Sequence, residues 1–520
     1  MKMSNNKIYL LYLIAFSTII RCVIAFTLEL GGEEAYYWTF ALYPKLSHLD
    51  QPPMIGWMIQ LFTNNLFLNE EFFIRLVSVF IGTLNTWVIF VIGRRFKSEL
   101  MGLYAAILYT TSIYSSIIVG TLVSPDTPQV LFLLLSIYFL HEGFIIKHQD
   151  CRESRVLSSI SLIMAGVFIG LAMLSNISSF IIWIGVFTYI SLFDRRCFKK
   201  PQLWFSFFIS FLLFLPVILW NVKYDFVGFN FFYNDIFVIK GNVDFGIIMQ
   251  KIVIQVIYNN PVNIALAFIA LFTFNKIRYL KENQYKLLIS LSLPFMLTGI
   301  IPIGFFPLIL LSAAYLETKY SSARFRFPDV LKNSYYSIIL IILIIMTQIY
   351  TGVFNFDIKK IPETKIGSDD VSIDRYGWKI LSKEFNKLRY MDVALGNISN
   401  HSYIISNNYL TAAHYDYYLA RPNKIAVKTI GNLNETRKYA FTTIEQGGFK
   451  IGESAYYIES SRDLTPGIPL GKRYFKSVEV AKVIYIRRMN NPVVRYTIYR
   501  FKELKYVPEE TLSPIIKKHV

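Results

Sequence analysis

The chain has 520 residues, of which 54% are hydrophobic and 17% aromatic, and its mean hydropathy is +0.42. These values exclude an ordinary soluble domain, because the apolar residues gather in runs of near bilayer-spanning length, such as 130–146 and 203–220. The net charge of +18 invites a nucleic-acid partner, but the basic residues are spread over short connections between the apolar runs. We therefore expect a polytopic membrane protein that binds no nucleic acid.

The apolar runs predict an all-α membrane domain of about eleven transmembrane helices in residues 1–352. The first run contains Arg21 and lacks a small-residue cleavage site, so it is interpreted as a retained helix rather than a signal peptide. The helices are expected near 8–28, 72–93, 103–120, 128–146, 157–174, 177–193, 203–220, 258–275, 286–300, 303–317 and 333–352.

The distribution of Lys and Arg between the connections predicts the orientation of the chain. Every second connection is rich in these residues, as at Arg94, Arg195 and Arg196, whereas the opposite connections hold few, such as Lys45 and Lys223. The positive-inside rule then places the N-terminus in the cytoplasm and the C-terminal part outside. We expect a multi-pass protein of the cytoplasmic (inner) membrane, surrounded by membrane lipids.

Residues 353–520 are predicted to form a separate extracytoplasmic α/β domain. Charged residues replace the apolar run from about 355 to 374, and 376–390 has hydrophobic residues at helical spacing. Two of the predicted strands flank a turn at 489–492, which is typical of a hairpin. The strands are expected at 402–406, 424–430, 454–459, 474–486 and 494–502.

The first outer loop, residues 29–71, carries the most informative acids. Glu33 and Glu34 lie directly after the first helix, beside aromatic residues such as Tyr37. A carboxylate beside a bilayer is costly to desolvate, so it usually faces water, a cation or a reacting group. In a helix adjacent side chains project about 100° apart, so one acid could deprotonate an acceptor while the other holds a ligand or a neighbouring helix. The alternative is that both acids only cap and solvate the loop.

The same loop contains a candidate metal site. Asp50 precedes the prolines at 52–53, which restrict the backbone around it, and His48 lies two residues earlier. His48 either pairs with Asp50 or, together with Glu34 and Asp50, contributes to a divalent metal site. The sequence leaves the need for a metal open.

Further candidates lie at the outer ends of other helices. Asp126 occupies the next outer loop, either as a helix N-cap or as a second carboxylate facing Glu33. Arg75, at the outer start of the second helix, either snorkels or binds a lipid phosphate. Asn221 and Lys223 end the seventh helix and are placed to contact a sugar or phosphate, although an aromatic belt also explains that region.

These stretches together resemble a known family, the bacterial GT-C glycosyltransferases of the protein-mannosyltransferase-like group (family 39). Their relatives include the aminoarabinose transferases that modify lipid A. The resemblance covers nearly the whole chain and depends on short motifs in the same order. These motifs fall at 33–38, 49–53, 124–126, 170–176 and 215–221, with two more at 376–378 and 413–419.

The resemblance implies transfer of a sugar from a polyprenyl-phosphate carrier to an acceptor on the outer side of the membrane. It makes Glu33 the expected catalytic base and Asp126 the catalytic aspartate of the second outer loop. It also matches Asp50 to the Asp that precedes the prolines in the family. We expect Glu34, Tyr37 and Asp50 to contact the substrate.

The chain departs from the family pattern at three positions. Glu33 replaces the usual Asp, Gln51 stands where the family has His or Lys, and Asn176 stands where it commonly has Lys. Two cations are therefore missing, which leaves Arg75 and Lys223 as candidates to bind the donor phosphate.

Three functions remain compatible with the sequence. The first is glycosyl transfer to lipid A, lipopolysaccharide or another envelope glycan, and the second is protein O-glycosylation. The third, of another class, is a transporter or flippase of lipid-linked sugars. A transporter favours polar or broken helices at mid-membrane, whereas these acids cluster at the outer helix ends. The sequence does not identify the sugar or the acceptor.

Overall fold

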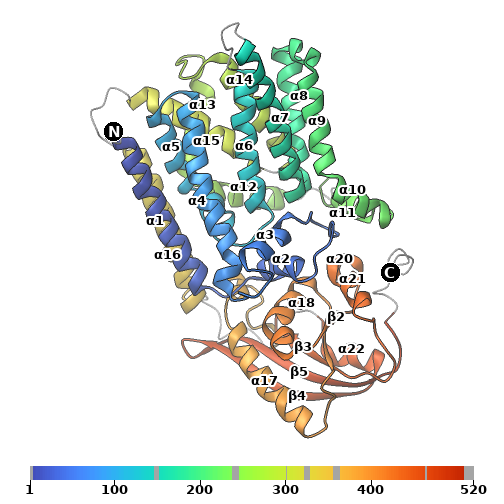
Figure 1. Cartoon of the computed structure of the whole chain (residues 1–520). Coiled ribbons are helices and arrows are strands. Elements are labelled where there is room, and N and C mark those ends of the chain that lie inside the picture. The colour runs from blue at the N-terminus through green and yellow to red at the C-terminus, as the bar shows by residue number, and fades with distance from the viewer. Residues whose placement is uncertain are drawn as a thin grey trace.

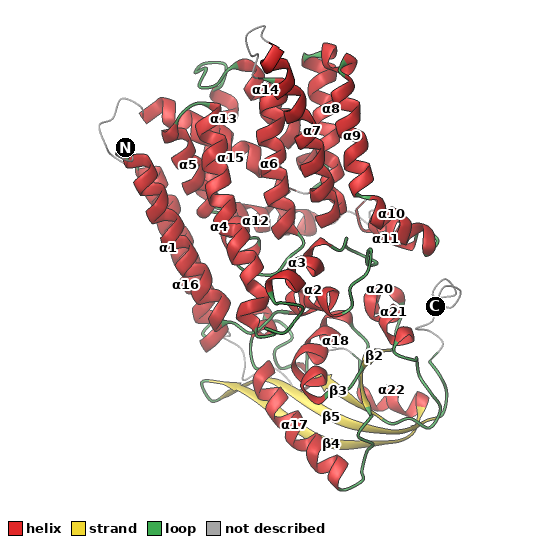
Figure 2. Ribbon diagram, viewed as in Figure 1, coloured by secondary structure: helices red, strands yellow, loops and turns green. Residues whose placement is uncertain are grey.

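The structure is a computed structural model that describes residues 4–145, 152–236, 245–299, 301–320, 328–354, 363–462 and 465–508. It combines a helical bundle with a smaller C-terminal part, residues 363–508, that contains a five-stranded sheet (Figure 1, Figure 2). The C-terminal part lies beyond one end of the bundle, and α2 and α3 lie between the two (Figure 1). The boundary expected at 352/353 adjoins residues 355–362, which lie outside the described residues.

Each apolar run predicted to be helical contains a helix. Among the described residues, four helices are long and apolar enough to span a bilayer, or up to six when each bent pair counts as one span. The count of about eleven spans therefore stays a prediction. The bundle contains α1 (Asn5–Thr27), α4 (Glu71–Phe96), α5 (Glu99–Thr110), η1 (Tyr114–Ile118), α6 (Asp126–Phe144), α7 (Arg152–Ser175), η2 (Ile177–Phe180), α8 (Ile181–Phe193), η3 (Arg195–Lys199), α9 (Pro201–Leu213), α10 (Leu215–Lys223), α11 (Val227–Ile236), α12 (Phe245–Asn259), α13 (Pro261–Thr273), α14 (Glu282–Leu297), α15 (Ile301–Tyr320) and α16 (Asp329–Thr351).

Three of the predicted helices are interrupted. The run 203–220 divides into α9 and α10, which meet at 48° just before Pro216, and α12 meets α13 at 93° next to Pro261. A proline lacks the N–H that would continue the helix, so a bend at each is expected. In the run 103–120, α5 ends at Thr110 and a π-helical turn follows, where the Ser116 hydroxyl donates to the Thr110 carbonyl.

The segment expected to be a loop contains two helices, α2 (Gly32–Leu42) and α3 (Met54–Phe62). Helix α2 begins with a capping interaction, in which the Gly31 N–H donates to the Glu34 carboxylate at 3.1 Å. The partial positive charge at a helix N-terminus also favours acids in the first turn. We call residues 29–71 the α2–α3 segment.

The strands of the C-terminal part were all predicted. They are β1 (Tyr403–Ser406), β2 (Val427–Thr429), β3 (Ala455–Ser460), β4 (Phe475–Arg488) and β5 (Asn491–Leu504). The sheet order is β2-β1-β3-β5-β4, with the first three strands parallel and β5 antiparallel to both neighbours. The predicted hairpin turns at Met489 and Asn490, whose φ angles are 43° and 69°.

Helices flank this sheet and contact the α2–α3 segment (Figure 1). Helix α18 packs on α2, and the Lys438 ammonium at the start of α21 is hydrogen-bonded to Thr39 of α2. The helices of this part are η5 (Glu363–Lys365), η6 (Val371–Arg375), α17 (Trp378–Ala394), α18 (Tyr409–Tyr415), η7 (Asp416–Ala420), α19 (Arg421–Asn423), α20 (Leu433–Thr436), α21 (Lys438–Glu445) and α22 (Gly467–Tyr474).

Candidate active site

A cavity of about 410 Å³ lies where the bundle, the α2–α3 segment and the C-terminal part meet. Its polar groups come from widely separated stretches of chain, among them the loop between α2 and α3, the start of α6 and the junction of α20 with α21. Its lining residues are Asp50, Gln51, Tyr114, Ile118, Asp126, Asn176, Ser178, Phe231, Phe232, Tyr258, Pro302, Ile303 and Arg437.

The two adjacent acids of α2 lie in different environments. Glu34 is buried, with 1% of its surface exposed, and forms an ion pair with Arg75 at 2.7 Å. Glu33 is exposed, and the hydroxyl groups of Tyr37 and Tyr409 lie within hydrogen-bonding reach of its carboxylate. One helical step thus separates a buried ion pair from an accessible acid, as the interpretation of two different roles requires.

The Glu34–Arg75 pair joins several elements. The Glu34 carboxylate also accepts hydrogen bonds from the N–H groups of Gly31 and Val123, at 3.1 and 3.2 Å. Burial raises the pKa of Glu34, but the Arg75 and Arg375 guanidinium groups and the Gly31 N–H outweigh it and hold that pKa at about 2. The remaining donors of Arg75 bind the carbonyl oxygens of Ala25, Leu28 and Glu29. The structure therefore does not bring Arg75 to the cavity.

Glu33 has an electrostatic environment suited to a base. Although the Glu33 side chain reaches solvent, the protein around it restricts the hydration of its carboxyl and raises its pKa, and the carboxylates of Asp50 and Asp374 raise it further. Tyr37 and Arg437 act in the opposite direction, but the net shift is upward. A carboxylate whose pKa is raised toward neutrality binds a proton more strongly than an ordinary surface acid.

Asp126 lines the cavity at the first residue of α6. Its carboxylate accepts hydrogen bonds from the Tyr114 hydroxyl at 2.9 Å and from the Asn176 amide at 3.2 Å. The departure at position 176 therefore replaces a family cation with an amide that orients this acid. Burial and then the carboxylates of Glu33, Asp50 and Asp126 raise the pKa of the Tyr37 hydroxyl well above its usual range.

Asp50 links the bundle side of the cavity to the C-terminal part. It accepts a hydrogen bond from the Tyr36 hydroxyl at 2.9 Å and forms an ion pair with Arg437 at 2.8 Å. Sequence reasoning did not find Arg437, which is 387 residues away from Asp50 in the chain. No local motif marks it, and only the docking of α21 against α2 brings it to the cavity.

The candidate metal ligands do not assemble. Glu34 is paired with Arg75, Asp50 is paired with Arg437, and the His48 ring packs against Phe40 with centroids 3.7 Å apart. Across the described residues, no group of three or more His, Cys, Asp or Glu side chains is arranged to hold a metal ion. The ligand set proposed from the sequence is therefore not formed.

The two candidates at the end of α10 lie outside the cavity lining. Asn221 is buried and joins α10 to α11, because its amide donates to the Val217 carbonyl at 3.0 Å and accepts from the Phe229 N–H at 2.9 Å. Lys223 is exposed, and its ammonium lies 5.2 Å from the centre of the Tyr224 ring. The structure does not bring either residue to Asp126.

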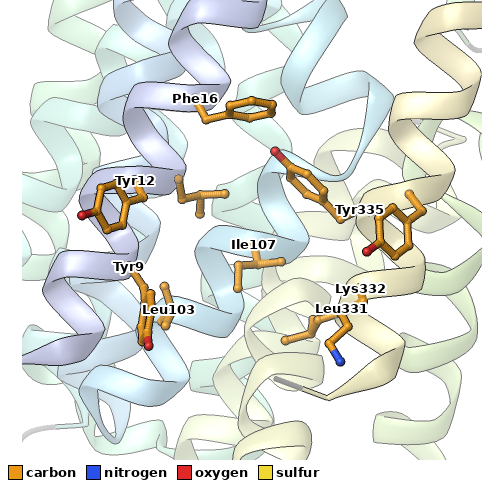
Figure 3. A pocket seen from close by; sticks show the side chains of 10 residues that line it. Tyr9, Tyr12, Phe16, Leu103, Ile107, Leu331, Lys332 and Tyr335 are labelled. Carbon is orange, nitrogen blue, oxygen red and sulfur yellow. The ribbon is translucent and has the colours of Figure 1, made fainter. Parts of the chain in front are cut away.

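A second cavity, of about 520 Å³, lies between α1, α5 and α16 (Figure 3). Lys332 is its one charged side chain among the described lining residues, and none of them carries a carboxylate. The acids and the cation needed for chemistry are found at the first cavity, not here. The second is lined by Tyr9, Tyr12, Leu13, Phe16, Leu103, Ile107, Leu331, Lys332, Tyr335 and Tyr336.

Residues 50–220 match the model of the family described as dolichyl-phosphate-mannose-protein mannosyltransferase. The matched region includes Asp50, Asp126 and Asn176 at the cavity, and it lies wholly within the chain that precedes the C-terminal part. The matched stretch of the bundle is similar to this family. This match confirms the resemblance expected from the motifs, and it supports the prediction of a glycosyltransferase.

The whole chain shares its fold with ArnT from Cupriavidus metallidurans. The apo structure of ArnT is 11% identical, with a TM-score of 0.57, and the alignment covers 96% of this chain and 98% of ArnT. The structure of ArnT bound to undecaprenyl phosphate is also 11% identical, with a TM-score of 0.61 and coverage of 97% and 98%. At this identity the similarity shows the fold alone. A comparison with curated protein sequences finds no match.

Proposed function

We propose that the protein transfers a sugar from a polyprenyl-phosphate carrier to lipid A, lipopolysaccharide or another envelope glycan. The observation that carries this proposal is the cavity in which Asp50, Asp126 and Arg437 meet, next to Glu33. The family match and the ArnT fold support it, because the ArnT structure was solved with undecaprenyl phosphate, which is a polyprenyl phosphate.

The proposal includes a location and a division of labour. The reaction takes place on the outer face of the cytoplasmic membrane, with the N-terminus in the cytoplasm. Residues 1–352 form the membrane domain, and residues 353–520 form an extracytoplasmic domain that covers the cavity. A polyprenyl chain remains in the bilayer while its phosphate and sugar reach the cavity at the helix ends.

The reaction needs little covalent chemistry from the protein. An acceptor oxygen attacks the anomeric carbon, the bond from that carbon to the phosphate oxygen breaks, and the polyprenyl phosphate departs with the bonding electrons. When the acceptor is a hydroxyl group, Glu33 takes its proton as the bond forms. An ionised phosphate acceptor has no proton to lose, so it needs only to be positioned.

The neighbouring groups position the reactants in this proposal. Asp126, held by Tyr114 and Asn176, presents a fixed acceptor for hydrogen bonds from a sugar hydroxyl. Asp50 lines the polar side of the cavity, and Tyr37 holds Glu33 next to it by a hydrogen bond.

Mass spectrometry of envelope lipids and glycans tests the proposal. A strain lacking the protein is compared with strains that carry the wild type, Glu33→Gln or Glu33→Asp, which restores the acid usual in the family. We expect one lipid or glycan to lose a sugar-sized mass in the deletion and Glu33→Gln strains and to recover it with the wild type and Glu33→Asp. Loss from an exported protein instead would indicate protein O-glycosylation. A glycan defect that Glu33→Gln fully repairs would indicate either transfer to a phosphate acceptor, which needs no base, or a transporter. No change in any glycan would refute transfer.

A further inference from the structure

We propose that Arg437, in the C-terminal part, is the residue that binds the phosphate of the lipid-linked donor. This inference deepens the function proposed above and depends on it. It assigns a positively charged phosphate-binding group to a stretch of chain that lies outside the region matched by the family model.

The charges that line the cavity are the first observation in favour of Arg437. Asp50 and Asp126 line the cavity with two carboxylates, and Arg437 is the one Lys or Arg side chain among its described lining residues. A phosphate that leaves with an additional negative charge needs a cation close to it. Gln51 and Asn176, which line the same cavity, are uncharged amides.

The other candidate cations are held elsewhere. Arg75 is fully buried and its donors are committed to Glu34 and to backbone carbonyls. Lys223 is exposed beside Tyr224 and does not line the cavity. By position and by charge, the binding of a phosphate in this cavity falls to Arg437.

The geometry of the Arg437 side chain suits an anion. Its Nη1 atom is 2.8 Å from Asp50, and its guanidinium carbon lies 4.1 Å from the centre of the Tyr409 ring and 5.3 Å from that of Phe231. These aromatic rings hold the plane of the guanidinium in place, while a quarter of the side chain stays exposed. Its Nε is buried without a hydrogen-bond partner among the described residues. A planar group with several donors binds phosphate oxygens in pairs.

The backbone at Arg437 is held in an uncommon conformation. Its φ and ψ angles are 44° and −125°, a region that non-glycine residues rarely adopt and that persists only where the surroundings enforce it. The enforcing contacts follow directly in the chain. The buried Lys438 ammonium is hydrogen-bonded to Thr39, and an ion pair joins Lys45 to Glu445 at the other end of α21. Helix α21 is thus attached to the α2–α3 segment at both ends, which fixes Arg437 at the cavity.

Asp50 is the partner that a phosphate displaces or shares. When no lipid-linked sugar is bound, the Asp50 carboxylate neutralises the charge of the Arg437 guanidinium. A phosphate monoester or diester offers more acceptor oxygens than this carboxylate and binds the same guanidinium. The ligand class is therefore a polyprenyl chain that ends in phosphate, and the uncharged polyprenyl alcohol gains nothing from Arg437.

The test measures binding of two lipids to the purified full-length protein in detergent micelles. The probes are undecaprenyl phosphate and undecaprenol, which differ only in the phosphate. For Arg437→Gln we expect affinity for undecaprenyl phosphate to fall at least about tenfold, the size of one charge-assisted hydrogen bond, with affinity for undecaprenol unchanged. The matched control is Arg421→Gln, which removes an arginine of the same part that lies against Trp38 and outside the cavity, and it should bind both lipids like the wild type.

The outcomes separate the two proposals. Unchanged preference for the phosphate lipid in Arg437→Gln overturns the role of Arg437 and leaves the proposed function intact. A wild type that does not distinguish the two lipids refutes the polyprenyl-phosphate donor and this inference together. If Arg437→Gln does not fold, Asp50→Asn decides the matter. It removes the competing carboxylate and keeps the cation, so affinity for undecaprenyl phosphate should hold or rise, and a fall overturns the inference.

Discussion

Two neighbouring residues of α2, Glu33 and Glu34, lie in different environments and have different roles. Side chains at successive positions point about 100° apart, so Glu34 faces the bundle while Glu33 faces the cavity side. Burial of Glu34 is offset by Arg75, and the same burial would be prohibitive for an unpaired carboxylate. Among the described residues no cation forms an ion pair with Glu33, and its pKa moves upward instead of downward.

Replacement of Glu34 by Gln should destabilise the fold strongly, because Arg75 would remain buried without a countercharge. We expect the free energy of unfolding to fall by about 3–5 kcal/mol. Chemical unfolding in detergent measures it, and Glu445→Gln, which breaks the more exposed pair with Lys45, should cost less than about 1 kcal/mol. Equal effects of the two variants would show that the buried Glu34–Arg75 pair stabilises the fold no more than the exposed Lys45–Glu445 pair does.

The same pair predicts how stability depends on pH. The folded pKa of Glu34 is about 2, below its ordinary value of 4.5. Its contribution to the free energy of unfolding is therefore complete above pH 4.5. That contribution is lost as the pH falls from 4.5 toward 2, because only the unfolded chain binds the proton in this range. The melting temperature of the wild type should fall over this range more steeply than that of Glu34→Gln. Parallel curves would show that Glu34 is not the titrating group.

Glu33 should determine the acid limb of the activity profile with a hydroxyl acceptor. A base works only when deprotonated, so transfer should decline as the pH drops through the raised pKa of Glu33. Restricted hydration raises this pKa most, Asp50 and Asp374 raise it further, and Tyr37 and Arg437 lower it. The initial rate should be about 10²- to 10⁴-fold lower in Glu33→Gln, and it should no longer decline at low pH. The rate of Glu33→Asp should still decline at low pH. Near-normal turnover by Glu33→Gln would exclude Glu33 as the base.

The sequence predicted part of the site for a physical reason. Acids beside a membrane are rare enough to stand out, so Glu33, Asp50 and Asp126 could be found from their positions alone. Arg437 could not, because arginine is common in a basic extracytoplasmic domain and its meaning comes from a contact across 387 residues. Arg75 was predicted as a phosphate ligand because the sequence did not show that Glu34 faces it.

At the scale of elements, hydropathy predicts where helices lie but not how closely they approach. Helices α4 and α5 meet at Gly93 and Gly102, where a Cβ added to Gly93 would lie 2.7 Å from the Gly102 Cα. Small residues permit such close backbone contact, which matters in a bilayer because lipid tails are as apolar as leucine. The bends at α10 and α13 could be anticipated from their prolines, whereas the partners of each helix could not.

Gly93→Ala should therefore destabilise the bundle, since the backbone of α5 must shift to admit the methyl group. We expect a loss of about 1–3 kcal/mol in the free energy of unfolding, measured by thermal or chemical unfolding in detergent. Phe80→Leu on the exposed side of the same helix serves as the control and should change stability by less than about 0.5 kcal/mol. A neutral Gly93→Ala variant would show that α4 and α5 are not closely packed there.

At the scale of the whole molecule, the cavity exists only where the bundle and the C-terminal part meet. Contacts between the α2–α3 segment and the C-terminal part repeat along its length, from the Gly32 N–H on Asp374 to the Tyr417 hydroxyl on the Asn69 carbonyl. The sheet and hairpin were predictable from turn residues and alternating patterns, but their position over the helix ends was not. The proposed donor site therefore depends on both parts lying on the same side of the membrane.

That requirement gives a direct test of orientation. In a background without native cysteines, Val371→Cys lies in the C-terminal part at a site that is 82% exposed, and Arg196→Cys lies in the exposed turn between α8 and α9. A membrane-impermeant maleimide applied to spheroplasts should label Val371→Cys at once and Arg196→Cys only after the membrane is permeabilised. The reason is the excess of Lys and Arg around Arg196, which the positive-inside rule places in the cytoplasm. The reverse pattern would place the cavity on the cytoplasmic face, where the donor phosphate, Arg437 and Glu33 would have to act on a cytoplasmic acceptor.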